Sequence, residues 1–164
     1  MASDGELYEL AERVGHKLRA AGRRIVTAES CTGGWVSKAL TDVPGSSDYV
    51  LSGVVCYSNR SKVEWLGVPE ALIAEHGAVG EPVARAMAAG IRERAHAGIG
   101  IGITGIAGPT GGTPENPVGT VAIAVLCGNV ETVRTFQFFG GRELVKFQAS
   151  QAALNMVRLM LLSS

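Results

Sequence analysis

The sequence lacks the residue patterns from which disulfide frameworks and metal sites are built. Its three cysteines are widely spaced without a CxxC pair, and its three histidines show no ligand spacing. Disulfide frameworks require paired cysteines, and zinc sites require clustered cysteine or histidine ligands. We therefore expect neither kind of site, and the odd, unpaired cysteines indicate a reducing compartment.

An excess of either charge and long apolar runs are also missing. The 15 lysines and arginines balance 15 aspartates and glutamates without a basic block, which argues against nucleic-acid binding but leaves a small anionic ligand open. No apolar run reaches the roughly 18 residues of a membrane span. The charged start, MASDGELYEL, is unlike a signal peptide. These absences predict a soluble, cytoplasmic protein that binds neither nucleic acid nor membrane.

The residues that are present predict one globular domain over 1–164, with helices and strands in alternation. Helical patterns cover 7–21, 35–43, 59–66, 69–76, 82–96 and 142–162. Strand patterns cover 24–28, 49–58, 98–104, 118–127 and 131–139, the last two joined by a turn at Gly128-Asn129. This order predicts a three-layer α/β/α sandwich around a mixed, mainly parallel sheet. The last helix is apolar on more than one side, so it either lies deep or forms the interface of a homo-oligomer.

The segment TAESCTGG (27–34) places a serine where a buried strand gives way to a glycine-rich turn and a helix. Unpaired amides at a helix N-terminus attract an anion or a developing oxyanion. Ser30 is therefore a candidate nucleophile, with the amides of Thr32, Gly33 and Gly34 beside it. Cys31 is its rival, but a cysteine without a nearby cation is usually unreactive.

A serine nucleophile needs a base, and no histidine has a reason to lie near Ser30. Lys62 is the alternative, because YSNRSK (57–62) ends the second strand and enters a helix. If the two strands are neighbours, Tyr57 and Lys62 lie near Ser30. A pairing of Ser58 with Lys62 is weaker, since Ser58 suits the N-cap of that helix. An isolated lysine is more often simply a surface residue.

Two glycine-rich segments invite a nucleotide-binding interpretation. Gly100, Gly102 and Gly105 match GxGxxG, but they lie within a strand pattern and no helix follows, so we interpret them as sites of close packing. The following segment, 105–117, is too rich in glycine and proline for a regular element. A long loop at the end of a buried strand either binds a ligand, with its amides facing an anion, or is a mobile surface loop.

Four segments in this order are similar to the C-terminal domain of the competence/damage-inducible CinA proteins: TAESCTGG, YSNRSK, GAVGEPV and GITGIAGPTGGTPENPVGT. The resemblance covers nearly the whole chain. It implies hydrolysis of nicotinamide mononucleotide (NMN) to nicotinate mononucleotide and ammonia, in pyridine-nucleotide salvage, without metal or other cofactor. The pyrophosphatase module of this family has no counterpart in these residues, so we expect no pyrophosphatase activity.

The resemblance also implies roles for individual residues. Ser30 attacks the carboxamide, Lys62 is the base and Tyr57 assists. The residues expected to bind the substrate are Glu29, Thr32, Gly33, Gly34, Thr104, Gly105 and Arg142. Arg142 and the 105–117 loop are candidates for holding phosphate and ribose, although Arg142 is equally consistent with a solvated arginine. Two positions depart from relatives, in which serines are common: Thr104, and Gly80 at a helix cap.

Two other kinds of function remain open at this stage. The chain could be a regulatory module whose glycine-rich loops bind a nucleotide without turnover, or an interaction domain that uses its apolar last helix. Release of ammonia from NMN distinguishes an enzyme from the first. A lack of thermal stabilisation by mononucleotides favours the second.

Overall fold

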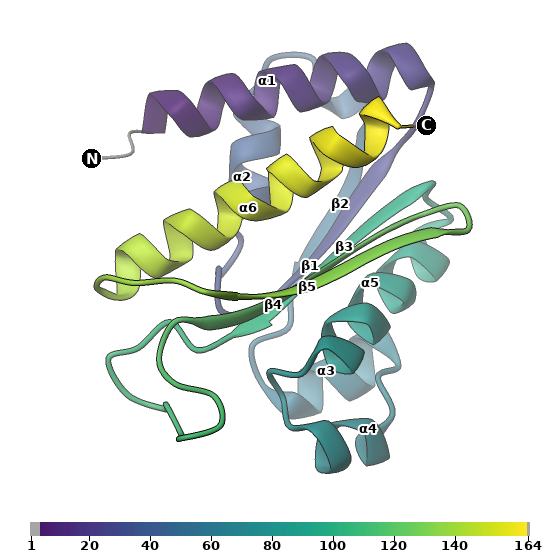
Figure 1. The fold of residues 1–164 in the computed structure, drawn as a ribbon. Helices are drawn as coiled ribbons and strands as arrows, with labels where there is room; N and C mark the ends of the chain where they lie inside the picture. Colours follow the sequence, from purple (N-terminus) through teal and green to yellow (C-terminus); the bar gives the residue numbers. More distant parts are fainter. Residues whose placement is uncertain (1–3, 164) are drawn as a thin grey trace.

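The computed structural model describes residues 4–163 as one five-stranded sheet with helices on both faces (Figure 1). The strands are β1 (Ile25–Glu29), β2 (Val50–Val55), β3 (Ile99–Gly105), β4 (Thr120–Cys127) and β5 (Val130–Gln137). The helices are α1 (Asp4–Ala21), α2 (Trp35–Thr41), α3 (Asn59–Leu66), α4 (Glu70–His76), α5 (Glu81–Ala95) and α6 (Arg142–Leu162), with a 3-10 turn at Ser46–Asp48. Each element predicted from periodicity is present, with bounds shifted by a few residues.

The sheet has the strand order β2-β1-β3-β4-β5. β1 pairs in parallel with β2 and β3, whereas β4 is antiparallel to both β3 and β5. Four strands therefore point the same way and β4 runs against them, which confirms a mixed, mainly parallel sheet. The predicted hairpin turn lies between Cys127 and Val130, with Gly128 at a positive φ of 59°.

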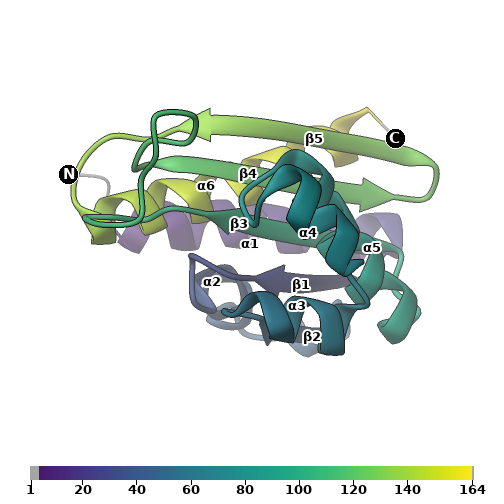
Figure 2. The same cartoon turned by 90° about the horizontal axis from the view of Figure 1, so that it is seen from below.

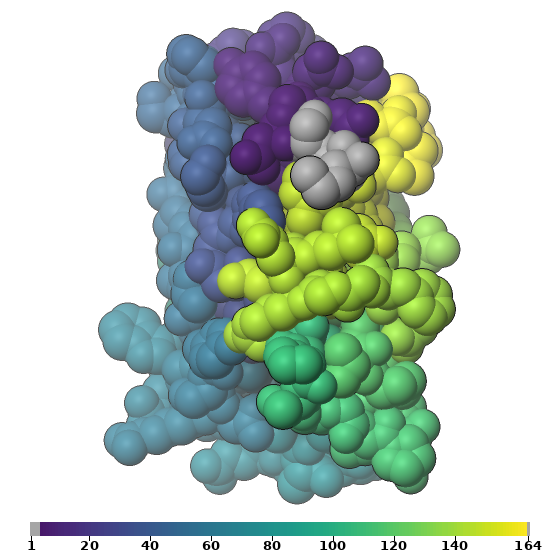
Figure 3. Space-filling model, turned by 90° about the vertical axis from the view of Figure 1, so that its left-hand side faces the viewer, coloured from purple at the N-terminus to yellow at the C-terminus, as the bar shows by residue number. Residues whose placement is uncertain are grey.

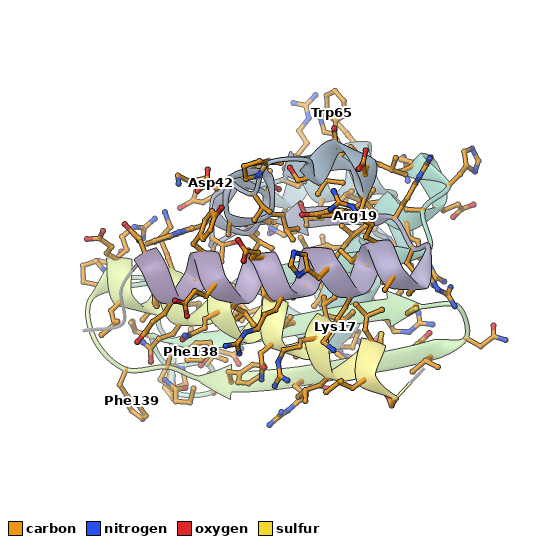
Figure 4. The ribbon with its side chains drawn as sticks, turned by 90° about the horizontal axis from the view of Figure 1, so that it is seen from above. Lys17, Arg19, Asp42, Trp65, Phe138 and Phe139 are labelled. Carbon is orange, nitrogen blue, oxygen red and sulfur yellow. The ribbon has the colours of Figure 1, made fainter. Side chains whose placement is uncertain are left out.

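Helices form a layer on each face of the sheet, as the sequence predicts. α1, α2 and α6 cover one face, and α3, α4 and α5 cover the other (Figures 1 and 2). Seen from above, α1 and α6 lie side by side across the sheet (Figure 4). α6 packs on α1, α2 and β4, so its wide apolar surface is explained by a deep position. Three of its leucines, Leu144, Leu159 and Leu162, remain exposed.

The glycines of β3 allow the sheet and α5 to approach closely. A Cβ atom on Gly100 would lie 2.5 Å from the carbonyl oxygen of Ala88, and one on Gly102 would overlap the carbonyl oxygen of Ala84. β3 then leads into an irregular segment instead of a helix. The close-packing interpretation of the GxGxxG match is therefore confirmed.

The topology places three strand ends at one edge of the sheet. The chain passes from β1 outward to β2 and then returns to β3 on the other side of β1. In α/β sheets such a reversal leaves a crevice at the carboxyl ends of the strands, where ligands bind. Ser30 follows β1, Tyr57 follows β2 and Gly105 ends β3, so this edge is where a site is expected.

Candidate active site

A pocket of about 330 Å³ lies at this edge of the sheet. Its lining residues are Ser30, Cys31, Tyr57, Asn59, Lys62, Ala78, Val79, Thr104, Gly105, Ile106, Ala107, Gly108, Thr110, Gly111 and Arg142. Figure 3 looks onto this end of the molecule, where the start of α6 in yellow-green meets the green 105–117 segment and the blue segments after β1 and β2. A larger hollow of about 550 Å³, between α3 and α4, contains none of the side chains predicted for catalysis.

The pocket brings together residues that are far apart in the sequence. The candidate nucleophile and base, Ser30 and Lys62, both line it, and so do Tyr57, Thr104, Gly105 and Arg142. Four other predicted site residues do not line it: Glu29, Thr32, Gly33 and Gly34.

Ser30 is held at the first position after β1 by its backbone. Its N–H donates to the carbonyl oxygen of Ile103 (3.0 Å), and its own carbonyl accepts from the N–H of Gly33 (3.0 Å). The side chain is 6% exposed, and its hydroxyl makes no hydrogen bond to another described residue. The hydroxyl therefore lies in the pocket without a hydrogen bond to the amine of Lys62, and a nucleophilic role requires the two groups to approach each other during catalysis.

Lys62 is a buried amine with no acidic side chain paired to it among residues 4–163. It lies on α3, whose start is fixed by a capping box in which the hydroxyl of Ser58 accepts from the N–H of Ser61 (3.0 Å). The lysine side chain is 2% exposed and makes no hydrogen bond or ion pair within residues 4–163. Burial lowers its pKa below the ordinary lysine value. Ser58 is thus confirmed as a helix cap, and Lys62 has the environment of a lysine that can lose its proton.

Cys31 lies in the same pocket but in a form that is chemically inert. Burial raises the pKa of its thiol to about 12, and the nearby carboxylate of Glu29 adds to the effect. The thiolate is the reactive form of cysteine, so the neutral thiol is a poor nucleophile near neutral pH. The environment therefore favours Ser30 over its neighbour.

Glu29 is turned away from the pocket and binds the start of α2. Its Oε1 accepts from the hydroxyl of Thr32 (2.6 Å) and the N–H of Val36 (2.9 Å). Its Oε2 accepts from the N–H and the hydroxyl of Ser37, each at 2.9 Å. The sequence interpretation had placed Glu29 and Thr32 against the substrate. Their side chains bind each other instead, and the carboxylate also occupies the amides of Val36 and Ser37 in the first turn of α2.

The expected oxyanion site at the start of α2 is likewise not formed as predicted. The N–H of Gly33 is used by the carbonyl of Ser30, and Gly33 and Gly34 have positive φ angles of 61° and 100°. Neither glycine lines the pocket. These glycines shape the turn, and we do not assign their amides to the substrate.

Arg142 spans the pocket from the first position of α6. Its guanidinium donates to the carbonyl oxygen of Gly108 (2.7 Å) and to the hydroxyl of Tyr57 (2.8 Å). A guanidinium carries about five N–H donors, so donors remain for a ligand. Tyr57 is 60% exposed and contacts this arginine, which points to anion recognition more than to assistance of the base.

Backbone amides on the far wall provide a second group of donors. Ala107 and Gly108 are buried, yet their N–H groups make no hydrogen bond to another described residue. The N–H groups of Thr110 and Gly111, also on the lining, are unpaired in the same sense. Buried amides are nearly always paired, so the unpaired amides of Ala107 and Gly108, on residues that line the pocket, are suited to an anion. Only the first half of the 105–117 segment lines the pocket.

Thr104 has a structural role that the sequence did not indicate. Its hydroxyl donates to the carbonyl oxygen of Ala78 (2.6 Å), which ties β3 to the segment before α5. Gly80 begins α5 without a side-chain cap, as expected from the absence of serine there. Sequence reasoning missed Asn59, Ala78 and Val79 on the lining. The only signal for them was their place in the YSNRSK and GAVGEPV segments.

The described residues contain no group of three or more His, Cys, Asp or Glu side chains that could hold a metal ion. Among residues 4–163, no helix combines the length and hydrophobicity that a membrane span requires.

Comparisons with known proteins agree on one family. The family model for the CinA C-terminal domain matches residues 7–161. A CinA-like protein from Anaeromyxobacter dehalogenans (strain 2CP-C) is 52% identical over 155 residues, which are 93% of this chain and 38% of that protein. The chain therefore spans less than half the length of this relative. Nicotinamide-nucleotide amidohydrolase PncC from Escherichia coli (strain K12) is 47% identical over 153 residues and covers 93% of each chain.

Solved structures give the same result at the level of the fold. The competence/damage inducible protein CihA from Agrobacterium tumefaciens superposes with a TM-score of 0.92 at 36% identity, covering 98% of this chain and 97% of that one. A CinA superfamily protein from Klebsiella pneumoniae 700603 has a TM-score of 0.93 at 36% identity, covering 96% and 99%. The sequence motifs, the fold and these matches together show that the chain belongs to the CinA C-terminal domain family.

Proposed function

We propose that this protein hydrolyses the carboxamide of nicotinamide mononucleotide, giving nicotinate mononucleotide and ammonia for pyridine-nucleotide salvage. The observation that carries the proposal is the pocket itself, which contains an unpaired serine hydroxyl, a buried lysine and a wall of anion-binding donors. The similarity to the Escherichia coli amidohydrolase over nearly the whole chain supports the same substrate.

In the first half of the reaction, Ser30 forms an ester with the substrate. Neutral Lys62 accepts the proton of the Ser30 hydroxyl as the oxygen attacks the carboxamide carbon. The resulting ammonium of Lys62 then protonates the leaving nitrogen, so that ammonia departs. Cys31 follows the nucleophile directly and lines the pocket, and its N–H replaces the amides of 32–34 as our candidate oxyanion donor.

In the second half, water releases the acid. Lys62 removes a proton from a water molecule that attacks the ester carbon, and it returns this proton to the Ser30 oxygen as the carbonyl–oxygen bond breaks. The carboxylic acid so formed gives its remaining proton to solvent and leaves as a carboxylate, and Ser30 and Lys62 regain their starting forms. A buried lysine suits both halves, because burial lowers its pKa and makes the neutral form easier to reach than for a lysine on the surface.

The phosphate of the substrate is assigned to Arg142 and to the amides of Ala107, Gly108, Thr110 and Gly111. Hydrogen bonds to a charged group contribute about 1.5–3 kcal/mol each. This assignment leaves the nicotinamide ring toward Ser30 and Lys62, at the other end of the same pocket.

The direct test is ammonia release by the purified protein from NMN, nicotinamide riboside and NAD. We expect rapid release from NMN and much slower release from the riboside, which has no phosphate for Arg142 and the loop amides. If NMN protects the protein against thermal unfolding but yields no ammonia, the chain is a nucleotide-binding module and the proposed activity is wrong.

A further inference from the structure

The carboxylate of Glu29 has no part in the chemistry proposed above, yet it is among the most fully bonded side chains in the structure. It is completely buried and receives the hydrogen bonds from Thr32, Val36 and Ser37 described above, two on each oxygen. Both carboxyl oxygens are thus saturated with hydrogen bonds from the first turns after β1. No cation is paired with it among the described residues.

The network around this carboxylate extends back into the sheet. The hydroxyl of Ser37 donates to Glu29, so the hydroxyl of Thr27 donates to Ser37 (2.6 Å). The carbonyl of Glu29 also accepts from the N–H of Cys56 (2.8 Å), after β2. Glu29 is thus fixed to β1 and β2 on one side and to the first turn of α2 on the other.

Ser30 lies in the sequence between Glu29 and Thr32, whose side chains are joined by a hydrogen bond of 2.6 Å. The carboxylate of Glu29 and the hydroxyl of Thr32 close a loop that contains only Ser30 and Cys31. The same loop is tightened by the hydrogen bond from the N–H of Gly33 to the carbonyl of Ser30. Opening the link to Thr32 would leave the turn held only by the two backbone hydrogen bonds of Ser30.

We propose that Glu29 is a positioning residue, whose hydrogen bond with Thr32 holds the turn that aims the Ser30 hydroxyl into the pocket. This inference rests on the proposed function for its reaction, and it extends that function by one residue that does not touch the substrate. It also explains why the start of α2 is closed to an external anion.

The test separates the hydrogen bond of Glu29 to the turn, through Thr32, from its hydrogen bonds to α2, through Ser37. Thr32→Val preserves the shape of the side chain but removes the hydroxyl on the turn. We expect kcat on NMN to fall by a factor between about 10 and 100, as for a misplaced reacting group, with KM changed little. Thr32→Ser restores the hydroxyl and should recover most of the lost kcat. Ser37→Ala removes a hydroxyl on the helix side, and should lower thermal stability more than kcat.

Glu29→Gln gives a second measure of the same link. Whichever oxygen it replaces, its amide nitrogen faces the N–H of Val36 or of Ser37 and cannot accept from it, so the carboxyl end that holds Thr32 is loosened; we expect a lower melting temperature and a fall in kcat smaller than that of Thr32→Val. A serine-directed phosphonofluoridate probe reports the nucleophile independently of NMN, and mass spectrometry of the peptide containing Ser30 gives its labelling rate. Labelling should slow in Thr32→Val and in Glu29→Gln, measured under conditions in which each variant is folded.

The inference is overturned if Thr32→Val retains the wild-type kcat and labelling rate, or if its only change is a higher KM. It is also overturned if Ser37→Ala lowers kcat as much as Thr32→Val, because the effect would then follow stability. If wild-type protein releases no ammonia from NMN but labelling of Ser30 still depends on Thr32, the proposed function fails and the positioning role stands.

Discussion

Lys62 determines the chemistry of the pocket at the scale of single residues. An ordinary lysine has a pKa of about 10.4 and is charged at neutral pH. Burial without a counter-ion lowers the pKa of Lys62, because the charged form loses its hydration. The neutral form, which can accept a proton, is therefore available at lower pH than for a lysine on the surface.

This environment predicts that Lys62→Arg is almost as damaging as Lys62→Ala. Arginine keeps the positive charge but has a pKa above about 12, so it cannot serve as a base. In the wild type, kcat should rise with pH through the lowered pKa of Lys62, since only the neutral form is active. Both variants should lose this ascending limb in a pH–rate profile of ammonia release. If Lys62→Arg retains most of the activity, Lys62 is an electrostatic anchor and the base is another group.

The same burial predicts a conflict between activity and stability. Folding lowers the pKa of Lys62, so between the folded and unfolded values the unfolded chain binds more protons and stability rises with pH. Below the folded-state value the full penalty of burying the charge is present. Lys62→Met should thus be inactive yet more stable by about 1 kcal/mol at neutral pH. In thermal unfolding, this gain should shrink as pH rises toward about 10.4. If the stability gained by Lys62→Met does not change with pH, it does not arise from removing a buried charge.

At the scale of elements, the glycines of β3 set how closely this strand and α5 approach each other. Gly102→Ala would force a Cβ atom against the carbonyl of Ala84 and to 2.7 Å from the N–H nitrogen of Ala88. Overpacking of this kind costs about 1–3 kcal/mol. We expect a clear fall in melting temperature. Gly98→Ala is the matched control, because its nearest neighbour would be the side chain of Arg23 at 3.5 Å, and its stability should be close to wild type.

The first turn of α6 and the segment after β3 form the phosphate end of the proposed site. Arg142→Ala should raise KM for NMN, while hydrolysis of nicotinamide riboside changes much less, because the riboside has no phosphate. Tyr57→Phe removes an acceptor that orients the guanidinium and should have a smaller effect in the same direction. Arg158→Ala, on the same helix but bonded to Asn155, is the control. Equal effects of Arg142→Ala on both substrates would show that it does not bind the phosphate.

The sequence predicted elements well because each has a local signal. Periodicity, glycine turns and the cap at Ser58 all act within a few residues, and the structure confirms the strands and helices that they indicate. The same local signals placed Ser30 just past one strand and Lys62 in the first turns of the helix that follows another, without establishing that the two strands are neighbours. Their meeting in one pocket follows from the parallel pairing of β1 and β2.

Contacts between distant residues could not be predicted in the same way. A carboxylate after a strand can face a ligand or bind the next helix, and only the path of the turn decides between them for Glu29. The hydrogen bonds from Thr104 to Ala78 and from Arg142 to Tyr57 join residues that are 26 and 85 positions apart. No pattern in the sequence specifies which hydroxyl or carbonyl a side chain reaches across the fold.

At the scale of the whole molecule, the topology and the burial of the site act together. The reversal from β2 to β3 creates the crevice, and helices on both faces bury the strands that carry it. Segments that follow the carboxyl ends of β1, β2 and β3 supply much of its lining. Burial in turn lowers the pKa of Lys62 and raises that of Cys31. One fold thereby lowers the pKa of the lysine and raises that of the cysteine, as the proposed roles of Lys62 and Ser30 require.

The central claim is that Ser30, and not Cys31, is the nucleophile of an NMN amidohydrolase. The most direct measurement compares ammonia release from NMN by the wild type, Ser30→Ala and Cys31→Ala, with thermal stabilisation by NMN as the measure of binding. We predict that Ser30→Ala releases no ammonia but is still stabilised by NMN, and that Cys31→Ala retains substantial activity. Sustained turnover by Ser30→Ala, or loss of turnover in Cys31→Ala alone, would contradict the account.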